Sequence, residues 1–359
     1  MDNANIDFVG KTQGGLSASG LVASEMAGHG LNVNRLRPYI DKDGKPCIAV
    51  HVGDKKYKKI GVNAATLRKD EWQQLDAAII PVVEHRLNGI QDLISRNLVY
   101  NLGGNGLGTT VLESHTISDA MEAELTMDGV HRGKGDRQLF GTTYLPLPII
   151  HVDYDINRRV LEASRRLGNS LDTTQAERAA RRVAEKLESM LFADEQYSFG
   201  GGTIYSYVNY PNRNKLTMDT AWDDSSMTGK QIVDDILRAK QAMLDAHFYG
   251  PWTIYISPNY ETLLDEDYND YRSGTIRERI LNIAGVESIK VVDTLADDNV
   301  IMVQMSSDVV RLVRGMGITN VQWDAEAMMT THFKVMTIQV PQIRSDYNGA
   351  TGIVHLATA

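Results

Sequence analysis

Four acidic side chains lie close together in the last third of the chain: Asp265, Glu266, Asp267 and Asp270, followed by Arg272. Closely spaced carboxylates are the ligands that Ca²⁺ prefers, and this run resembles the opening of a calcium loop. An EF-hand loop needs glycine at its sixth position and glutamate at its twelfth, where this chain has Asp270 and Ile276. The segment therefore fails as a calcium site, and a solvated acidic loop is the plain interpretation.

A glycine-rich segment, GGNGLG, suggests phosphate binding, because closely spaced glycines let backbone amides approach an anion. The spacing fails in detail. Thr109 stands where the dinucleotide fingerprint needs its third glycine, and no lysine follows as a P-loop requires. We interpret the segment instead as a flexible joint. Its glycines are Gly103, Gly104, Gly106 and Gly108.

The remaining reactive side chains form no catalytic pattern. The nine histidines never occur as HExxH, and no GxSxG elbow is present. Asp153 and Asp155 face the same side of an expected strand, but the nearby Arg158 favours an ion-pair network over a catalytic pair. His151 and His332 lie in apolar strands, which favours hydrogen-bonded core histidines. We therefore predict no catalytic, cofactor-binding or metal-binding residues, and no enzyme activity.

Composition narrows the class of protein further. With 359 residues, 42% of them hydrophobic, the chain can bury a large core. Its net charge of −9 argues against a surface devoted to gripping nucleic acid phosphates. One cysteine, Cys47, cannot form an internal disulfide. The first residues lack the basic start and apolar core of a signal peptide, and no membrane-spanning run occurs, so we expect the chain to stay in the cytoplasm.

The most regular element is a long amphipathic helix that starts near Thr174, where Thr174 and Glu177 have the spacing of a capping box. Apolar residues then recur three or four positions apart along one face, and arginines and Lys186 occupy another. A second capping pair, Thr228 and Gln231, predicts the start of a shorter helix. The long helix is expected to present its core face through Val183, Leu187, Met190 and Leu191.

Two stretches lack a core pattern. Residues 1–30 are rich in glycine, serine and alanine, which is typical of an arm that orders only against neighbours. Residues 109–148 carry several glycines and no convincing apolar periodicity. So long a weakly patterned segment is unusual inside a compact domain, and it predicts an excursion from the body of the molecule.

The order of these elements resembles a known family. A tryptophan-containing helix, LRKDEWQQLDAAIIPVVEHRLNGIQDLI, precedes LVYNL and the glycine segment. Then come LPLPII, the long helix, GPWTIYISPNYETLL and a final HFKVMTIQVPQI strand. Over residues 67–345, this succession resembles the encapsulins and the tailed-bacteriophage major capsid proteins of the Hong Kong 97 type. No single motif is specific; the resemblance comes from several weak matches in the family's order.

The resemblance implies an α+β fold of the Hong Kong 97 type, divided as follows: an N-terminal arm (1–66), the first part of a peripheral domain (67–108), an extended loop (109–148), the peripheral domain with its spine helix (149–195), an axial domain (196–318), and the peripheral return with the C-terminus (319–359). Asp265, Glu266, Asp267, Asp270 and Arg272 would then belong to a loop at the capsomer axis. The tip of the extended loop would consist of Asp128, Gly129, His131, Arg132, Lys134 and Arg137. Of these, His131, Arg132, Lys134 and Arg137 would bring positive charge to an acidic neighbour.

The resemblance also implies a function: a major capsid protein of an encapsulin-like subgroup, forming pentamers and hexamers of an icosahedral head around double-stranded DNA. The DNA would be enclosed without sequence-specific binding. A separate scaffolding protein, a portal and a decoration protein are the expected partners, with assembly in the bacterial cytoplasm and no membrane or cofactor. We expect residues 1–66 to be retained in the virion. The alternatives are an encapsulin-type nanocompartment shell and a cytoplasmic α/β enzyme.

Overall fold

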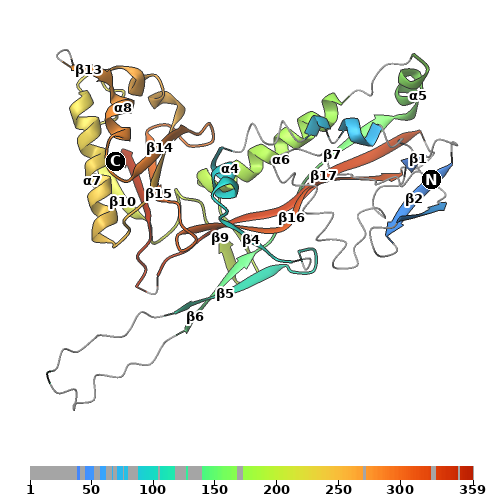
Figure 1. The fold of residues 1–359 in the computed structure, drawn as a ribbon, viewed down its shortest axis with the longest axis horizontal. Helices are drawn as coiled ribbons and strands as arrows, with labels where there is room; N and C mark the ends of the chain where they lie inside the picture. Colours follow the sequence, from blue (N-terminus) through green and yellow to red (C-terminus); the bar gives the residue numbers. More distant parts are fainter. Residues whose placement is uncertain are drawn as a thin grey trace.

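The structure is a computed structural model of the 359-residue chain. It describes residues 39–40, 45–51, 57–61, 67, 71–75, 77–79, 88–103, 106–117, 127, 140–167, 173–269, 272–324, 329–346 and 348–358. Two halves and a projecting ribbon make up the molecule (Figure 1). One half carries the long helix α6 over a four-stranded sheet, and the other carries α7 and α8 beside a five-stranded sheet.

The half that carries α6 is called the peripheral half, and the half that carries α7 and α8 is called the axial half. The peripheral half is built on strands that come from distant parts of the chain. Its order is β4 (Val99–Asn101), β16 (Val310–Asp324), β17 (Thr330–Ile343) and β7 (Ile150–Asn157). β16 and β17 form a long antiparallel pair, and β17 also pairs antiparallel with β7. Helix α5 (Arg158–Leu167) follows β7, and α4 (Asn88–Ser95) precedes β4.

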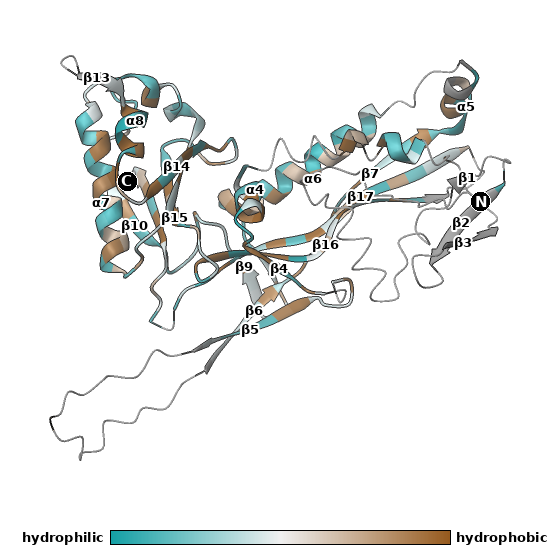
Figure 2. Ribbon diagram, in the orientation of Figure 1, coloured by the Kyte–Doolittle hydropathy of each residue, from teal (hydrophilic) through white to brown (hydrophobic). Residues whose placement is uncertain are grey.

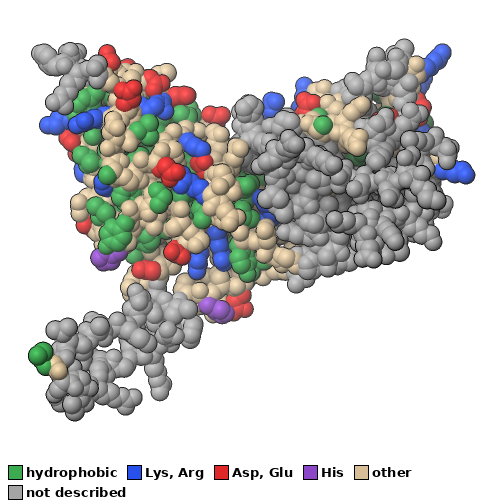
Figure 3. Space-filling view, viewed as in Figure 1, with side chains coloured by type: hydrophobic (Ala, Val, Ile, Leu, Met, Phe, Trp, Pro, Cys, Tyr) green, Lys and Arg blue, Asp and Glu red, His purple; other side chains and the backbone are tan. Residues whose placement is uncertain are grey.

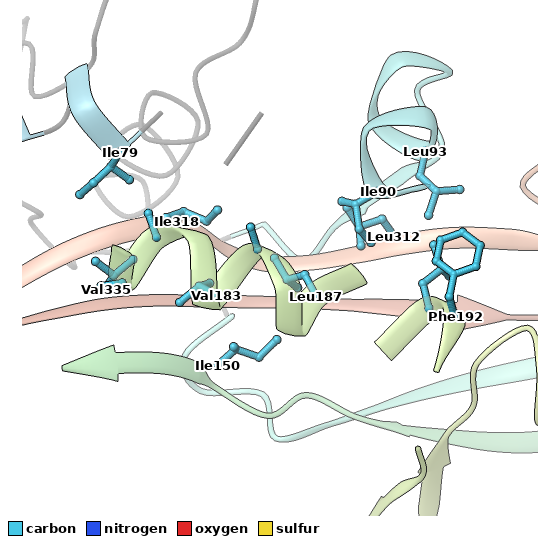
Figure 4. Packing of buried hydrophobic residues seen from close by; sticks show 14 of the residues in the cluster. Ile79, Ile90, Leu93, Ile150, Val183, Leu187, Phe192, Leu312, Ile318 and Val335 are labelled. Atoms are coloured by element: carbon cyan, nitrogen blue, oxygen red, sulfur yellow. The ribbon is translucent and has the colours of Figure 1, made fainter. Parts of the chain in front are cut away.

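The spine helix α6 (Thr174–Phe192) lies along one face of this sheet. Val183, Leu187 and Leu191 are 0% exposed, and Met190 is partly buried against the same core. Figure 4 shows Val183 and Leu187 among Val335, Leu312 and Ile150 of the strands. Hydropathy alternates around the helix as the sequence predicts, with polar residues on its outer side (Figure 2).

The start of α6 differs by one residue from the expected capping box. Thr173 is the N-cap, and its hydroxyl donates a hydrogen bond of 2.7 Å to the Glu177 carboxylate. Thr174 is already the first helical residue. Thr173 and Thr174 are adjacent, so the capping-box spacing of Thr174 and Glu177 placed the N-cap one residue too late. The second predicted cap is confirmed: the backbone N–H of Thr228 donates to Gln231 Oε1 at 2.8 Å, where α7 (Gly229–Asp245) begins.

The axial half contains a sheet ordered β10 (Asn214–Met218), β18 (Ile353–Thr358), β15 (Asn299–Gln304), β11 (Trp252–Ile256) and β14 (Val286–Val291). Helix α8 (Ile276–Leu281) and α7 cover one face. Short elements η1 (Pro258–Tyr260), η2 (Leu263–Asp265), β12 (Asp267–Asn269) and β13 (Arg272–Thr275) connect β11 to α8.

On its C-terminal side, the predicted axial domain, residues 196–318, differs from the observed sheets in two ways. The C-terminal strand β18 lies inside the axial sheet, parallel to β10 and antiparallel to β15. Conversely, β16 begins at Val310 and belongs to the peripheral sheet. The two halves therefore exchange strands. Their partners lie far away in the sequence, so no local pattern marks the exchange.

The halves also share a hydrophobic core. One cluster joins α6 residues such as Leu187 to Tyr255 and Ile301 of the axial sheet. The opposite face of that sheet, with Ile254 and Met302, packs in a second cluster against α7. A third, smaller cluster surrounds Leu145 and Leu147 below the peripheral sheet.

Four short sheets complete the described chain, one of them the antiparallel pair of β12 and β13. β1 (Tyr39–Ile40), β2 (Pro46–His51) and β3 (Tyr57–Gly61) form an antiparallel sheet. β5 (Val111–Ile117) pairs with β6 (Phe140–Pro146), and β8 (Tyr197–Phe199) pairs with β9 (Gly202–Ile204). In the described part of the chain, no helix combines the length and apolar character needed to cross a membrane.

Candidate assembly surfaces

The most prominent surface is the two-stranded ribbon of β5 and β6, which points away from both halves (Figure 1). Thr142, Thr143 and Tyr144 are exposed on it. The hydroxyls of Ser114 and Thr143 hydrogen-bond across the strands at 2.7 Å. A ribbon this exposed buries little surface within its own subunit, which is unusual for a strand pair that must be stable.

The base of the ribbon is firmly anchored. Leu145 and Leu147 are each 5% exposed and pack with Val313 and Ile338 of the peripheral sheet. The amide of Gln342 donates to Ser114 Oγ at 3.0 Å. The base of the ribbon is therefore held to the peripheral sheet by packing and by a hydrogen bond. The six predicted tip residues, Asp128, Gly129, His131, Arg132, Lys134 and Arg137, lie outside the described residues.

A second surface is the β8–β9 hairpin, which contacts β6 at the base of the ribbon. All three residues of β8 are exposed, and Tyr197 and Phe199 retain 48% and 54% of their surface. Residues two apart on a strand share a face, so these rings form one aromatic edge. The tyrosine-rich sequence around Tyr197 favours packing between subunits, whereas Phe199 carries no distinctive sequence signal. Contiguous exposed aromatic surface is typical of protein interfaces.

The predicted glycine joint contains two different environments. Gly103 has φ +53° with open space around its Cα, as a flexible position would. Gly106 is instead buried, and a Cβ there would lie 2.0 Å from the carbonyl oxygen of Gly315. Close backbone packing, and not bending, therefore requires glycine at Gly106. Gly108 is exposed in the same turn, and Gly104 lies outside the described residues.

The acidic loop of the axial half carries an ion pair that the sequence did not reveal. Asp265 accepts a hydrogen bond of 2.7 Å from Arg277 Nε, and the same guanidinium reaches the carbonyl of Glu261. Arg277 lies in α8, twelve residues away, and was overlooked in favour of Arg272. Glu266 and Asp267 are exposed. Asp270 lies outside the described residues, and the structure does not describe the side chain of Arg272.

The candidate catalytic aspartates take part in a cross-strand charge network. Asp155 contacts His332, and Asp153 lies 3.5 Å from both Lys334 and His151. The β7–β17 register places His332 opposite Asp155 and Lys334 opposite Asp153, whereas His151 lies two residues from Asp153 on β7. The interpretation of His151 and His332 as core histidines is wrong, because their side chains remain 50% and 32% exposed. Pairing with β17, rather than the nearby arginines, explains the network.

No constellation for metal binding occurs among the described residues, where no three His, Cys, Asp or Glu side chains converge suitably. On the face of the axial half shown in Figure 3, acidic and basic side chains are interspersed. Such a surface lacks the basic stripe that phosphate binding needs.

A polar cleft of about 570 Å³ lies where α6 meets the axial half. Arg182 and Lys186 line it, each paired with a carboxylate: Glu185 at 2.9 Å and Glu195 respectively. Asp293 and Thr294 contribute the axial side, and Glu188 of α6 also lines it.

Three solved structures have a fold similar to that of this chain. A virus-like particle from Pyrococcus furiosus is similar at 18% sequence identity with a TM-score of 0.57, covering 79% of this chain and 98% of that chain. The capsid of Myoviridae phage XM1 is similar at 12% identity and a TM-score of 0.57, covering 76% and 92%. The capsid of the native GTA particle matches at 10% identity and a TM-score of 0.53, covering 86% and 95%. The predicted α+β fold of the Hong Kong 97 type is thereby confirmed.

The chain itself belongs to the family of unknown function DUF6260, whose model matches residues 63–356.

Proposed function

We propose that this protein is a shell subunit, the major capsid protein of a tailed bacteriophage, which assembles into pentamers and hexamers of an icosahedral head. The observation that carries the proposal is the Hong Kong 97-type fold spanning 76–86% of the chain in three shell-forming neighbours. Double-stranded DNA would be enclosed without sequence-specific contacts, in keeping with the net charge of −9.

The described surfaces support association through several modest contacts. The anchored β5–β6 ribbon would overlay an adjacent subunit, and the aromatic edge of Tyr197 and Phe199 would add apolar area at its base. The loop around Asp265 would gather near a capsomer axis. Arg277 would then limit the repulsion between copies, since it already neutralises one carboxylate in each. Several such interfaces per subunit would sum to a stable shell.

A phage head is favoured over an encapsulin-type compartment by the N-terminal segment. The chain has 62 residues before the family match, and they include the β1–β3 strands. By the resemblance, encapsulins begin near the equivalent of Leu67. A scaffolding protein, a portal and a decoration protein would then act as partners, with assembly in the host cytoplasm and the shell as final location. Among the residues that the structure describes, no constellation favours the alternative of a cytoplasmic enzyme.

Electron microscopy of the purified full chain, alone and co-expressed with its neighbouring genes, tests the proposal. We expect closed shells or five- and six-membered rings, and nuclease-resistant double-stranded DNA in particles from a lysate of producing cells. Shells that enclose a protein cargo and no DNA would support the encapsulin alternative. Dispersed monomers at high concentration under both conditions would contradict a shell role altogether.

A further inference from the structure

A buried carboxyl group sits where the two halves of the molecule meet. Glu188 of α6 is 4% exposed. Its Oε1 accepts a hydrogen bond of 3.0 Å from the backbone N–H of Gly89, in the first turn of α4. Its Oε2 is buried and has no hydrogen-bond partner among the described residues. An ionised carboxylate with one unsatisfied oxygen is costly to bury, whereas a neutral carboxyl is much less so.

Helix α4 links this carboxyl to the axial sheet. Asp92 accepts a hydrogen bond of 2.8 Å from the Tyr255 hydroxyl and also pairs with Lys290. One turn further on, Arg96 pairs with Glu287 at 2.6 Å. α4 is thus fixed to β11 and β14 on one side and to α6 on the other.

The contact between α4 and α6 is tight. A Cβ on Gly89 would lie 2.4 Å from the ring of Phe192 and 2.9 Å from Leu191. The N–H of Gly89 can therefore approach Glu188 only while the two helices stay closely packed. A carboxylate would accept this hydrogen bond more strongly than a neutral carboxyl, so any opening of the seam on ionisation must come from Oε2, which has no partner among the described residues.

The charges around Glu188 disfavour its ionised form. Asp92 of α4 and Asp293 after β14 are negative, and the hydroxyls of Tyr207 and Tyr255 carry no positive charge. The nearby cations are already engaged: Lys290 with Asp92, Arg182 with Glu185, and Lys186 with Glu195. Burial, reinforced by Asp92 and Asp293 against the opposing bonds from Gly89 and Ile90, raises the pKa of Glu188 to about 7.

We propose that Glu188 is a proton-dependent lock between the spine helix and the axial half, closed while its carboxyl is neutral and released when it ionises. The adjoining cleft supplies the route for water and the proton. On ionisation, water from the cleft would solvate Oε2, and the first turn of α4 would separate from α6. Because α4 holds β11 and β14, the axial half would gain freedom relative to the spine helix. The lock is a property of the single subunit and holds whether or not shells form.

Hydrogen-exchange mass spectrometry on the full chain tests the lock at pH 5.5 and pH 8.0, with rates corrected for intrinsic amide chemistry. At pH 8.0, roughly nine in ten Glu188 side chains would be ionised if the pKa is 7. We expect peptides covering residues 88–95 and 286–295 to exchange several-fold faster at pH 8.0 than at pH 5.5. Peptides from α7 should not change.

Substitutions separate the lock from a general pH effect. Glu188→Gln keeps the shape without the charge, and we expect its protection to be the same at both pH values. Glu185→Gln, on the rim of the cleft, is the matched control and should behave like the unaltered chain. Asp293→Asn removes a neighbouring negative charge and should move the opening midpoint to lower pH.

With less repulsion, the Glu188 carboxylate forms more easily, so a true lock must open at lower pH in Asp293→Asn. A midpoint that moves to higher pH contradicts the proposal. Asp293→Asn also decides the matter if Glu188→Gln does not fold. Equal protection of the unaltered chain at both pH values, or unchanged pH dependence in Glu188→Gln, would overturn the lock.

Discussion

At the scale of single residues, two buried titratable groups oppose each other in their effect on stability. Because the pKa of Glu188 is raised, its contribution to the free energy of unfolding is complete below about pH 4.5 and is lost as the pH rises through about 7. Burial beside Arg213 and Lys215 lowers the pKa of His355 from 6.5 to about 4, so its contribution is present above 6.5 and is lost as pH falls towards 4. The two effects partly cancel in the unaltered chain, so single substitutions are needed to see either.

The His355 ring is held in its neutral form by its hydrogen bonds. Nδ1 accepts from Arg213 Nε at 3.2 Å, and Nε2 donates to Asn299 Oδ1 at 2.6 Å. Protonation of Nδ1 would place its hydrogen against a guanidinium. We predict that His355→Gln removes part of the stability loss between pH 6.5 and pH 4, measured by urea unfolding. His115→Gln, on the exposed ribbon, should leave the loss of unfolding free energy between pH 6.5 and pH 4 unchanged. The same loss in both variants and in the unaltered chain would refute the assignment.

Gly106 gives a second residue-scale prediction. Its Cα faces the backbone of Gly315, which cannot move aside as a side-chain end would. Gly106→Ala should therefore lower the free energy of unfolding by about 2 kcal/mol or more, as overpacking does. Gly103→Asn is the control in the same segment, since asparagine tolerates the positive φ and meets open space. Thermal melts of the two variants compare them, and equal stability would favour a true hinge at Gly106.

At the scale of elements, α6 joins the peripheral sheet to the axial half through one continuous apolar face. Its small residues Ala176, Ala180 and Ala184 are all within 1% of complete burial, which lets the helix approach the strands closely. Larger residues further along the same face reach the axial core. Damage to this face should therefore affect both halves together.

Substitution on the two sides of α6 tests that orientation. Leu187→Asp would bury an unpaired carboxylate at a 0% exposed site and should cost several kcal/mol, on the order of 4. Arg182→Glu alters a side chain that is 76% exposed and paired with Glu185 on the rim, so it should cost less than about 1 kcal/mol. Soluble yield and thermal unfolding measure the difference. Comparable losses would mean that the core face is misassigned.

At the scale of the whole molecule, the exchange of strands makes the two halves one folding unit. β18 completes the axial sheet and β16 completes the peripheral one, so neither sheet is made from a single stretch of chain. The ribbon is the exception, since beyond its anchored base it contributes little to the shared core. Folding and assembly should therefore be separable by changes to the ribbon.

Deletion of residues 128–136 tests this separation. The anchored base of the ribbon is untouched, so we expect the melting temperature of the isolated subunit to stay within a few degrees of the full chain. Assembly, followed by light scattering and microscopy, should fall sharply if the tip contacts a neighbouring subunit as we propose. A charge variant, Arg132→Glu with Lys134→Glu, should show a weaker form of the same defect. Normal shells from the deletion variant would make the tip dispensable.

The sequence by itself determined what depends on neighbours along the chain. Period-3.6 spacing located the buried face of α6 through Leu187, and Thr228 with Gln231 marked the start of α7. The order of weakly matching segments indicated the fold. Each of these signals arises within one helix or in the succession of elements, so the sequence alone is enough to detect it.

Tertiary structure alone decided the pairings between distant segments. The insertion of β18 beside β10, the approach of Gly106 to Gly315, and the burial of Glu188 against Gly89 all join residues about a hundred or more positions apart. Register between such segments is set by the packing of both faces of a sheet and by the helices that cover it, not by local propensity. The proton-dependent seam between the halves exists only because that packing removes Glu188 from water.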